Sequence, residues 1–548
     1  MKEWFKKGEH WIWFSASTVS ISVVLVFGLL GMIAWKGLIH FWPHAVYHIE
    51  VQHQSGQQEV IVGELHDTKM KQVEDNTAPH GSREVPQYLF KIGNRDVYGI
   101  DFRWVSSEDM VGGVERLEKD VVVIERYEYG NVYGHIESVK LNGQVEYNPH
   151  KALEMLAEQV EKGSALHSEI HHLEKIEIGA INYKIEGLRL EEKRLRANND
   201  FDAKAEARLA AERAELQKEF DTLHQAVQVL YQQAESTGEV TLRIAGERTL
   251  NVPVNKIVSF WQPNNMTTAE SIGFFFSNIG KFMWDEPREA NTEGGVFPAI
   301  IGTVTMVMLM AIFVTPMGVI AAIYMSEYAK EGVLLRMVRI SINNLAGVPS
   351  IVFGIFGLGF FVYILGSSID ELFYSYALPS PTFGTPGLLW ASLTMALLTL
   401  PVVIVSTQEG LSRVPRALRE GGLALGATKS ETIMRIVLPM TMPAIMTGLI
   451  LAIARAAGEV APLMLVGVVK LAPELPLDMV APFVHLDRKF MHLGFHIYDV
   501  GFQSPNVEAS QPLVYATSLL LVLIILGLNL GAITIRNRLR EKYKSLDH

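Results

Sequence analysis

The sequence predicts an α-helical membrane protein with six spans and a large α+β insertion outside the cytoplasm, placed after the first span. Apolar stretches long enough to cross a bilayer occur near both ends of the 548-residue chain, since about 20 apolar helical residues span the hydrocarbon core. Between them lies a polar, charged block, residues 37–290. Its pattern changes from short β-type runs to long helical periodicity and back, which indicates a mixed α+β region.

The overall composition averages these two populations. The chain is 49% hydrophobic and 20% charged, with a formal net charge of −11. Basic residues form no continuous stripe, so we expect no nucleic-acid partner. The absence of cysteine excludes disulfides, thiolate chemistry and Cys-ligated metal sites.

The first span is predicted as an uncleaved transmembrane anchor over residues 11–36. Residues 11–35 carry no charge, and tryptophans near both ends favour interfacial anchoring. A cleaved signal peptide is the alternative, but the apolar run is too long for one and residues 37–43 offer no small-residue cleavage site. Residues 1–10 are expected to be a cytoplasmic N-terminus because they contain three lysines. These are Lys2, Lys6 and Lys7.

The insertion is predicted to be a β domain split by a helical hairpin. Short β-branched and aromatic runs precede and follow the helical part. They are residues 59–63, 88–92, 97–104, 121–127, 240–244 and 250–254. Residues 151–234 read as two long antiparallel helices, which turn at 197–201 and in which Asp200 or Asp202 caps the second arm.

The second arm of the hairpin carries a heptad pattern. Leucines at 209, 216, 223 and 230 lie seven residues apart, as at the seam of a coiled coil. On the first arm, His167 and His171 share one helix face and could form a metal pair. Solvated histidines are the favoured interpretation because no third ligand is apparent, and we expect no metal site.

Five further spans are predicted between residues 291 and 535. They cover residues 297–324, 343–365, 388–405, 440–469 and 512–535. A basic turn at 330–339, the loop at 412–439 and the tail at 536–548 then fall on the same side as the N-terminal lysines. By the positive-inside rule this side is cytoplasmic, so both termini are expected there and the insertion outside.

The loop at 412–439 is polar, basic and punctuated by glycine. Two amphipathic helical pieces, 414–425 and 429–438, flank Gly426, where a positive φ costs least. Pro439 starts the next apolar run, where its missing N–H is harmless. From composition alone, an ordinary cytoplasmic loop explains these features as well as a docking element does.

The spacing within this loop resembles the EAA loop of ABC importer permeases. The matching residues are Glu420, Gly421, Gly422, Gly426, Ile436, Leu438 and Pro439. The resemblance implies a coupling helix that is held in a groove of an ATPase subunit, and a type I ABC importer permease fold. Gly421 and Gly422 replace two alanines that are usual in the family, which loosens the first helix by about 1 kcal/mol each.

The fifth predicted span contains Arg455 and Glu459, four residues apart and therefore on one helix face. A charge at mid-bilayer costs about 3 kcal/mol, so such residues are usually paired and functional. The pair could be a structural ion pair that fixes helix packing. Alternatively it could be an anion site or gate, since the planar fork of an arginine suits an oxyanion.

The segments 455–463 and 344–354 resemble the phosphate-specific ABC permease family of the PstA type. The resemblance implies that Arg455 and the docking-loop Arg419 take part in transport of the anion, with Glu459 beside them in the substrate path. This sequence departs from the family at Val460, where a threonine is usual, and in its long insertion. The role of that insertion is therefore left open.

The family resemblance also implies the partners. No P-loop motif occurs, and Gly426–Ser430 lacks the necessary upstream glycine, so we expect no directly bound cofactor and no catalytic residue. ATP would be used by a separate ATPase dimer. A C-type phosphate permease, a periplasmic phosphate-binding protein and the lipid bilayer of the bacterial inner membrane complete the expected surroundings. Alternatives are a sulfate or molybdate permease and, in another class, a membrane-anchored coiled-coil scaffold or sensor.

Overall fold

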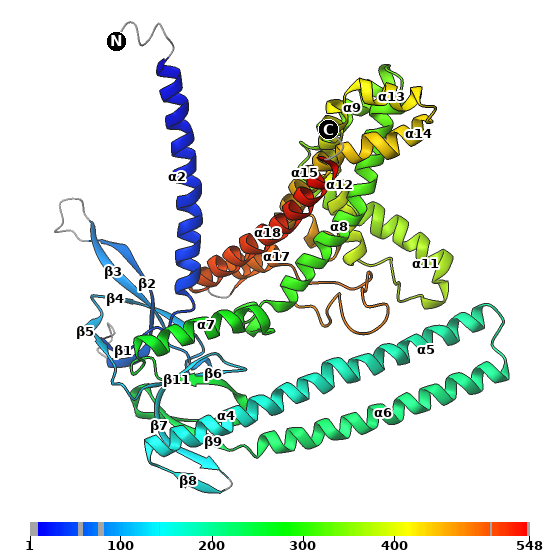
Figure 1. Cartoon of the computed structure of the whole chain (residues 1–548). Helices are drawn as coiled ribbons and strands as arrows, with labels where there is room; N and C mark the ends of the chain where they lie inside the picture. The colour runs from blue at the N-terminus through cyan, green and yellow to red at the C-terminus, as the bar shows by residue number, and fades with distance from the viewer. Residues whose placement is uncertain (1–8, 53–57, 75–81, 142, 505–506, 545–548) are drawn as a thin grey trace.

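A computed structural model describes residues 9–52, 58–74, 82–141, 143–504 and 507–544 (Figure 1). The chain forms an α+β part and a bundle of long apolar helices, which are joined at the foot of helix α2 (Glu9–Ile39). Helix α2 begins, and α18 (Val507–Lys544) ends, on the side opposite the α+β part. The predicted cytoplasmic lysines at positions 2, 6 and 7 lie outside the described residues, as do the last four residues of the tail.

The predicted β domain consists of two antiparallel sheets. The first has the order β4-β3-β2-β1-β5 and the second β10-β9-β7-β6-β11, with β8 paired to β7. The strands of the first sheet are β1 (Val46–Gln52), β2 (Gln58–Glu74), β3 (Ser82–Lys91), β4 (Phe102–Ser106) and β5 (Met110–Arg116). Those of the second are β6 (Val122–Arg126), β7 (Val132–Leu141), β8 (Gln144–Glu146), β9 (Glu239–Ile244), β10 (Arg248–Pro253) and β11 (Ile257–Trp261). A small ladder joins β12 (Pro287–Arg288) to β13 (Glu293–Gly294).

One predicted strand, 97–104, is partly wrong. Residues Arg95–Tyr98 form the short helix α3, and the strand starts only at Phe102. The flanking Asn94 and Gly99 have φ values of 52° and 75°, so the chain turns there. The left-handed region is one that asparagine and glycine adopt at low cost.

The prediction of a hairpin inserted in a split β domain is confirmed. Strands that precede the hairpin pair with strands that follow it, as β7 does with β9 and β6 with β11. The arms are α4 (Pro149–His171), a π-helical turn (His172–Ile178) and α5 (Gly179–Ala197), followed by α6 (Ala203–Glu235). The Asp202 side chain accepts a hydrogen bond from the Ala205 N–H and caps α6, as one of the two alternatives foresaw. A coiled-coil seam along α6 stays a prediction.

The hairpin lies beneath the helical bundle and contacts it (Figure 1). The Tyr183 ring lies 5.4 Å from the His485 ring, edge to face, and the Arg488 guanidinium is 5.8 Å from the same tyrosine ring. His171 is 3.1 Å from Glu286, and His167 stacks on Tyr127 at 3.9 Å. These two histidines therefore serve separate packing contacts.

Six helices among the described residues are long and apolar enough to cross a membrane, as predicted. They cover Trp11–Ile39, Phe297–Tyr328, Ser350–Phe373, Leu388–Arg413, Lys429–Gly458 and Val507–Arg538. The bundle contains α8 (Phe297–Ile323), α10 (Ser350–Phe356), α11 (Ser367–Phe373), α12 (Leu388–Arg413), α15 (Leu438–Gly458) and α18. Its core is a buried apolar cluster in which Met306, Met310 and Met395 pack against Val466 and Phe490.

Shorter helices and turns connect or extend these spans. They are α7 (Thr268–Trp284), α9 (Val333–Leu345), α13 (Arg416–Ala424), α14 (Lys429–Thr432), α16 (Leu463–Val466) and α17 (Leu493–Tyr498). Further π-helical turns occupy Tyr324–Tyr328, Gly357–Gly366, Ile433–Val437 and Asp499–Gln503. Short 3-10 turns occupy Ala245–Glu247, Val254–Lys256, Glu289–Asn291 and Ser375–Ala377.

Several predicted span boundaries are wrong. The third span starts at Ser350, not at 343, because residues 333–345 form the separate helix α9 and Pro349 starts the next one. That helix continues through Asp370, which was expected in a loop. Asp370 is buried and accepts hydrogen bonds from the backbone N–H groups of Phe383 and Gly384.

The remaining corrections concern helix ends. The fifth span was expected to reach residue 469, but α15 ends at Gly458. Pro439 does not start a new helix, because a π-helical turn joins α14 to α15 without a break. The last helix runs past residue 535, through the basic tail, to Lys544.

Candidate functional site

The predicted pair Arg455 and Glu459 sits where the fifth span breaks. Arg455 lies in the last turn of α15, whereas Glu459 follows the helix with extended backbone angles of φ −84° and ψ 135°. The Nε of Arg455 is 3.7 Å from an Oε of Glu459. The expectation that both share one face inside a continuous helix is therefore wrong, although the side chains still meet across the helix end.

The break has a local cause and a tertiary cause. Pro462 lies four residues after Gly458, and the short helix α16 starts directly after it. Proline disfavours helical angles in the residue before it. The segment beyond α16 pairs with other loops, since the Gly387 N–H donates to the Val466 carbonyl and the Val469 N–H to that of Phe490. These bonds fold the chain back toward the start of α12.

Arg455 faces outward from the bundle. Its side chain is 34% exposed and that of Glu459 is 24% exposed. Thr447, Leu451 and Gly458 are exposed on the same side of α15, at helical spacing. A Cβ at Gly458 would meet no atom within 4 Å. The pair is thus accessible on a face of this chain rather than enclosed by it.

The predicted docking loop is a helix–turn–helix at the other end of the bundle (Figure 1). Helix α13 ends at Ala424, and Gly426 has the predicted positive φ, at 88°. A capping box at Thr428 and Glu431 starts α14. The other signature residues, Glu420, Ile436, Leu438 and Pro439, lie on α13, in the π-helical turn and at the start of α15.

The two glycines that replace the usual alanines differ in their surroundings. A Cβ on Gly421 would meet no atom within 4 Å, whereas one on Gly422 would lie 2.9 Å from Ile436 Cδ1 and 3.2 Å from Thr432. Gly422 therefore allows α13 to approach the π-helical turn closely. No packing contact of this kind explains why residue 421 is a glycine.

The docking element also exposes apolar side chains that the sequence analysis did not single out. Leu425 is 91% exposed and Met434 63% exposed, with Leu418 and Leu423 exposed nearby. Exposed apolar residues around a polar helix pair are typical of a protein-binding surface. The amphipathic pattern of residues 414–425 was the feature of the sequence that could have indicated this exposed apolar surface.

Arg419 is held within the chain. Its Nη1 lies 3.2 Å from the Glu327 carboxylate at the end of the second span, and its Nη2 donates to the Leu411 carbonyl. Lys429 donates to the backbone carbonyl of Glu327. The structure does not bring Arg419 and Arg455 together, because the 21-residue helix α15 separates the docking loop from Arg455.

Six spans, an accessible charged pair beside a broken span and an exposed helix–turn–helix at the opposite end fit a membrane transport permease. Comparisons with known proteins agree. Residues 314–544 match the family described as binding-protein-dependent transport system inner membrane component. The chain is 34% identical to the phosphate transport system permease protein PstA 1 of Mycobacterium tuberculosis (strain CDC 1551 / Oshkosh) over 245 residues, which is 44% of this chain and 71% of the relative.

Other similarities cover a comparable share of the chain. The phosphate transport system permease protein PstA of Yersinia pestis is 32% identical over 273 residues, or 50% of this chain and 83% of the relative. Among solved structures, the inward-facing MetNI methionine ABC transporter is 17% identical over 44% of this chain and 94% of that chain, with a TM-score of 0.32. The chain belongs to the family of PstA-type inner-membrane permeases of binding-protein-dependent ABC importers.

Membership in this family carries further statements. The chain is a multi-pass inner-membrane transport permease, and ATP hydrolysis belongs to a separate subunit. Its partners include an ATPase and a binding protein. The family match, residues 314–544, leaves out the α+β insertion.

Proposed function

We propose that the chain is a permease subunit of an ATP-driven importer of inorganic phosphate, and that Arg455 lies on the path of the anion. The observation that supports this most directly is the accessible Arg455, held beside Glu459 at the broken end of the fifth span. The names of the relatives supply the substrate class. The chemistry of the Arg455–Glu459 pair supports the proposal that Arg455 lies on the path of the anion.

An arginine on an outward face of a membrane helix needs a polar partner or water, because exposing its charge to lipid costs about 3 kcal/mol. Glu459 supplies one partner but leaves the remaining donors of the guanidinium available. A fork of N–H donors suits the oxygens of a tetrahedral oxyanion. Glu459 can orient the fork and can accept a proton from a monoprotonated phosphate.

A second permease subunit, of the C type, completes the path in this proposal. The face of α15 that carries Arg455 and Leu451 is open in this chain, so another subunit can close it around the anion. A periplasmic phosphate-binding protein delivers the anion on the side of the insertion. No cofactor is bound by the permease itself.

The ATPase dimer docks on the residues from Glu420 to Pro439. Closure of the ATPases on ATP moves α13, and α14 transmits this motion because it is continuous with α15, which carries Arg455. Rigid-body rocking around a fixed site is how many transporters alternate access. In this arrangement, both termini are cytoplasmic and the insertion is periplasmic.

Another oxyanion, such as sulfate or molybdate, is the second candidate, since the guanidinium fork fits any tetrahedral oxyanion. A coiled-coil scaffold or sensor is not supported, because the membrane part matches a transport family.

The test is uptake of labelled phosphate at low concentration in cells that lack their own high-affinity phosphate permease. The cells would express this chain with its operon partners, and excess sulfate would be the competitor. We expect uptake that resists sulfate and falls at least tenfold in Arg455→Gln. The matched control is Arg189→Gln, which removes an exposed Arg–Glu pair on the hairpin and should leave uptake unchanged.

Three outcomes would change the proposal. Normal uptake in Arg455→Gln, with normal assembly, would make the ion pair structural. Uptake abolished by excess sulfate would favour the second candidate. No phosphate uptake by an assembled complex would refute phosphate as the cargo.

A further inference from the structure

A cavity of about 260 Å³ lies where the first span enters the α+β part. Its walls come from the end of α2, from β3, from the segment Pro287–Gly294, from α7 and from the start of α18. These elements are far apart in the sequence and meet only at the level where the membrane helices end (Figure 1).

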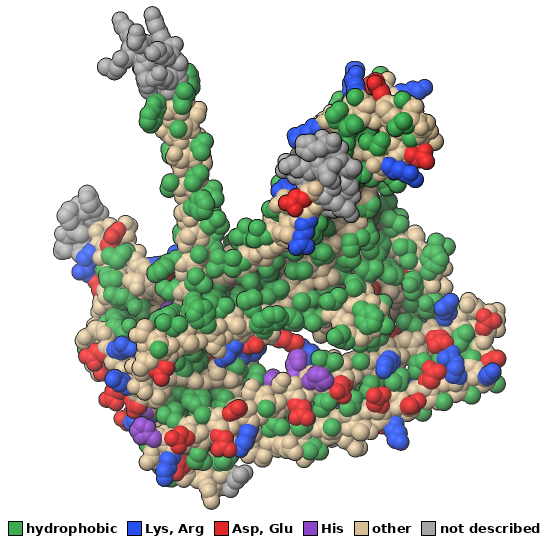
Figure 2. All heavy atoms as spheres, in the orientation of Figure 1, with side chains coloured by type: hydrophobic (Ala, Val, Ile, Leu, Met, Phe, Trp, Pro, Cys, Tyr) green, Lys and Arg blue, Asp and Glu red, His purple; other side chains and the backbone are tan. Residues whose placement is uncertain are grey.

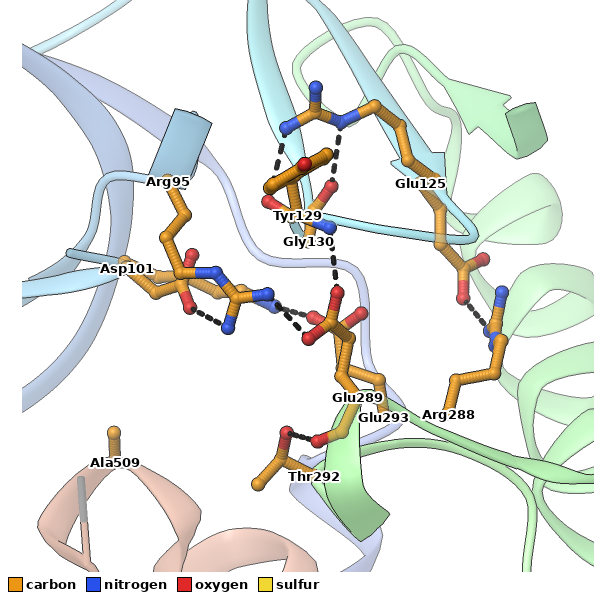
Figure 3. Close-up of polar contacts among 12 residues, drawn as sticks. Arg95, Asp101, Glu125, Tyr129, Gly130, Arg288, Glu289, Thr292, Glu293 and Ala509 are labelled. Atoms are coloured by element: carbon orange, nitrogen blue, oxygen red, sulfur yellow. Dashed lines mark hydrogen bonds and ion pairs between the residues drawn. The ribbon is translucent and has the colours of Figure 1, made fainter. Parts of the chain in front are cut away.

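One wall of the cavity is charged. Lys91 Nζ lies 3.7 Å from a carboxylate oxygen of Glu293, and Arg288 forms an ion pair with Glu125, which also accepts from the Ser259 hydroxyl at 2.7 Å. Figure 3 shows Arg288 and Glu125 turned toward each other, with Glu293 on the adjoining segment. Lys281 adds a further cation to this wall.

Three polar atoms of residues that line the cavity are buried yet have no hydrogen-bond partner among the described residues. They are Nη1 of Arg288, Nε1 of Trp261 and Oε2 of Glu293. Buried polar groups are nearly always paired, and leaving one unpaired costs free energy. Two donors and one acceptor, all on residues that line one cavity, therefore suggest a ligand that has both an acceptor and a donor.

The other wall is apolar and belongs to the membrane-facing helices. It is formed by Ile39, Phe41, Phe274, Phe282 and Leu513. Helix α2 touches α18 only near its end, where Gly37 approaches the Tyr515 backbone and Lys36 lies over the Tyr515 ring. Above this crossing the two helices diverge, and the apolar side chains of α2 are exposed (Figures 1 and 2).

The histidines of the cavity do not supply its positive charge near neutral pH. Burial lowers the pKa of His66 to about 4, and the ring also contacts the Ala509 carbonyl at 2.8 Å. Burial likewise lowers the pKa of His44. The cationic groups are therefore Lys91, Lys281 and Arg288.

We propose that this cavity binds the headgroup of a zwitterionic phospholipid with a primary ammonium. Arg288 and Trp261 donate to the phosphate diester, and the ammonium donates to Glu293. The acyl chains lie along the exposed surfaces of α2 and α18, where the apolar wall continues. A free phosphate shares the first set of contacts, but it has no ammonium for Glu293 and no apolar part.

This site is independent of the transport path. The cavity lies where the first span meets the α+β part, whereas Arg455 lies on α15 of the bundle. A lipid held there would fix the angle between the anchor helix and the insertion. The inference therefore does not rest on the identity of the transported anion.

The test is lipid retention by the purified permease complex, measured by native mass spectrometry. The complex would be exchanged into nanodiscs of phosphatidylethanolamine, phosphatidylcholine or phosphatidylglycerol and then released. We expect tight retention of phosphatidylethanolamine only, because the quaternary ammonium of phosphatidylcholine has no N–H and phosphatidylglycerol has no ammonium. Inorganic phosphate at 100-fold excess should not displace the lipid.

The variants are Trp261→Phe and Glu293→Gln, and Arg189→Gln is the control. We expect at least tenfold less retention of phosphatidylethanolamine in Glu293→Gln and a smaller loss in Trp261→Phe. Equal retention of the three lipids, or unchanged retention in both variants, would overturn the proposal. Displacement by inorganic phosphate would assign the cavity to free phosphate instead.

Discussion

Removing Arg419 is expected to release the docking helix α13 from the second span. Arg419 contacts Glu327, a side chain only 10% exposed, and the carbonyl of Leu411. These contacts join α13 directly to the π-helical turn Tyr324–Tyr328 at the end of the second span, and to α12. The substitution Arg419→Ala would remove both contacts and leave the Glu327 carboxylate unpaired.

The geometry sets the magnitude. Two unit charges 3.2 Å apart attract by about 5 kcal/mol at an effective dielectric constant of about 20. Arg419 is 27% exposed, so water screens part of this, and we expect a coupling free energy between Arg419 and Glu327 of about 2 kcal/mol. Arg419→Ala alone should cost more, about 3 kcal/mol, because it strands a buried charge.

The assay is a double-mutant cycle with Arg419→Ala and Glu327→Gln in the assembled complex. Hydrogen exchange of the α13 amides gives the free energy of local opening for each variant. Arg413→Ala is the matched control, since Arg413 is 79% exposed and lies 4.0 Å from Glu409, and it should change this free energy by less than about 0.5 kcal/mol.

The alternative for Arg419 is a direct role in the substrate path. Loss of phosphate uptake in Arg419→Ala with unchanged hydrogen exchange in α13 would refute the interpretation that Arg419 only holds α13 against the second span. Additive effects of the two substitutions, within about 0.5 kcal/mol, would show that the ion pair contributes nothing. Faster hydrogen exchange in α13 together with lower phosphate uptake would support the structural role of Arg419.

Three further predictions concern the glycine pair, the hairpin and the β domain. Gly421→Ala should stabilise α13 by about 1 kcal/mol while Gly422→Ala should not, because its methyl group would meet Ile436; equal exchange rates of α13 in the two variants would contradict this. Tyr183→Ala removes ring contacts to His485 worth about 1 kcal/mol, so amide exchange in α5 should be about fivefold faster, and an unchanged rate would show that other contacts hold the hairpin. Burial raises the pKa of Glu64 from its ordinary value of 4.5 to about 7. The folded state then binds the proton more tightly than the unfolded state, so stability is lost as pH rises from 4.5 through 7. Glu64→Gln cannot lose a proton at this position, so its thermal midpoint should rise relative to that of the wild type between pH 5 and pH 8. The rise should correspond to about 3 kcal/mol at most. A difference between the two midpoints that does not change with pH would refute the pKa shift.

Local patterns in the sequence were enough to predict the six spans, the hairpin and the docking turn. Hydrophobicity over about 20 residues identifies a span without any knowledge of its neighbours. The cap at Asp202 and the positive φ of Gly426 depend on the few residues around them. For the same reason, the return of β strands after the hairpin revealed a split domain.

The third and fifth spans show where local patterns were insufficient. An apolar run does not show whether the chain continues as a helix or folds back, so the expected span to residue 469 included the break after Gly458. The amphipathic helix α9 directly precedes the third span, and its apolar residues extend the apolar run of that span, so the boundary between them was not visible in the sequence. Hydrogen bonds to distant loops, such as that between Gly387 and Val466, decide the outcome.

The sequence by itself determined the class of protein and the residue types of its site: a permease with an arginine and a glutamate near the end of the fifth span. Only the tertiary structure decided that Arg455 is accessible at a helix end, that Arg419 pairs with Glu327, and that α2, α7 and β3 enclose a charged cavity. The physical reason is the distance along the chain over which each interaction acts. Helix formation, capping and membrane insertion follow from neighbouring residues, whereas ion pairs and cavities depend on segments that only folding brings together.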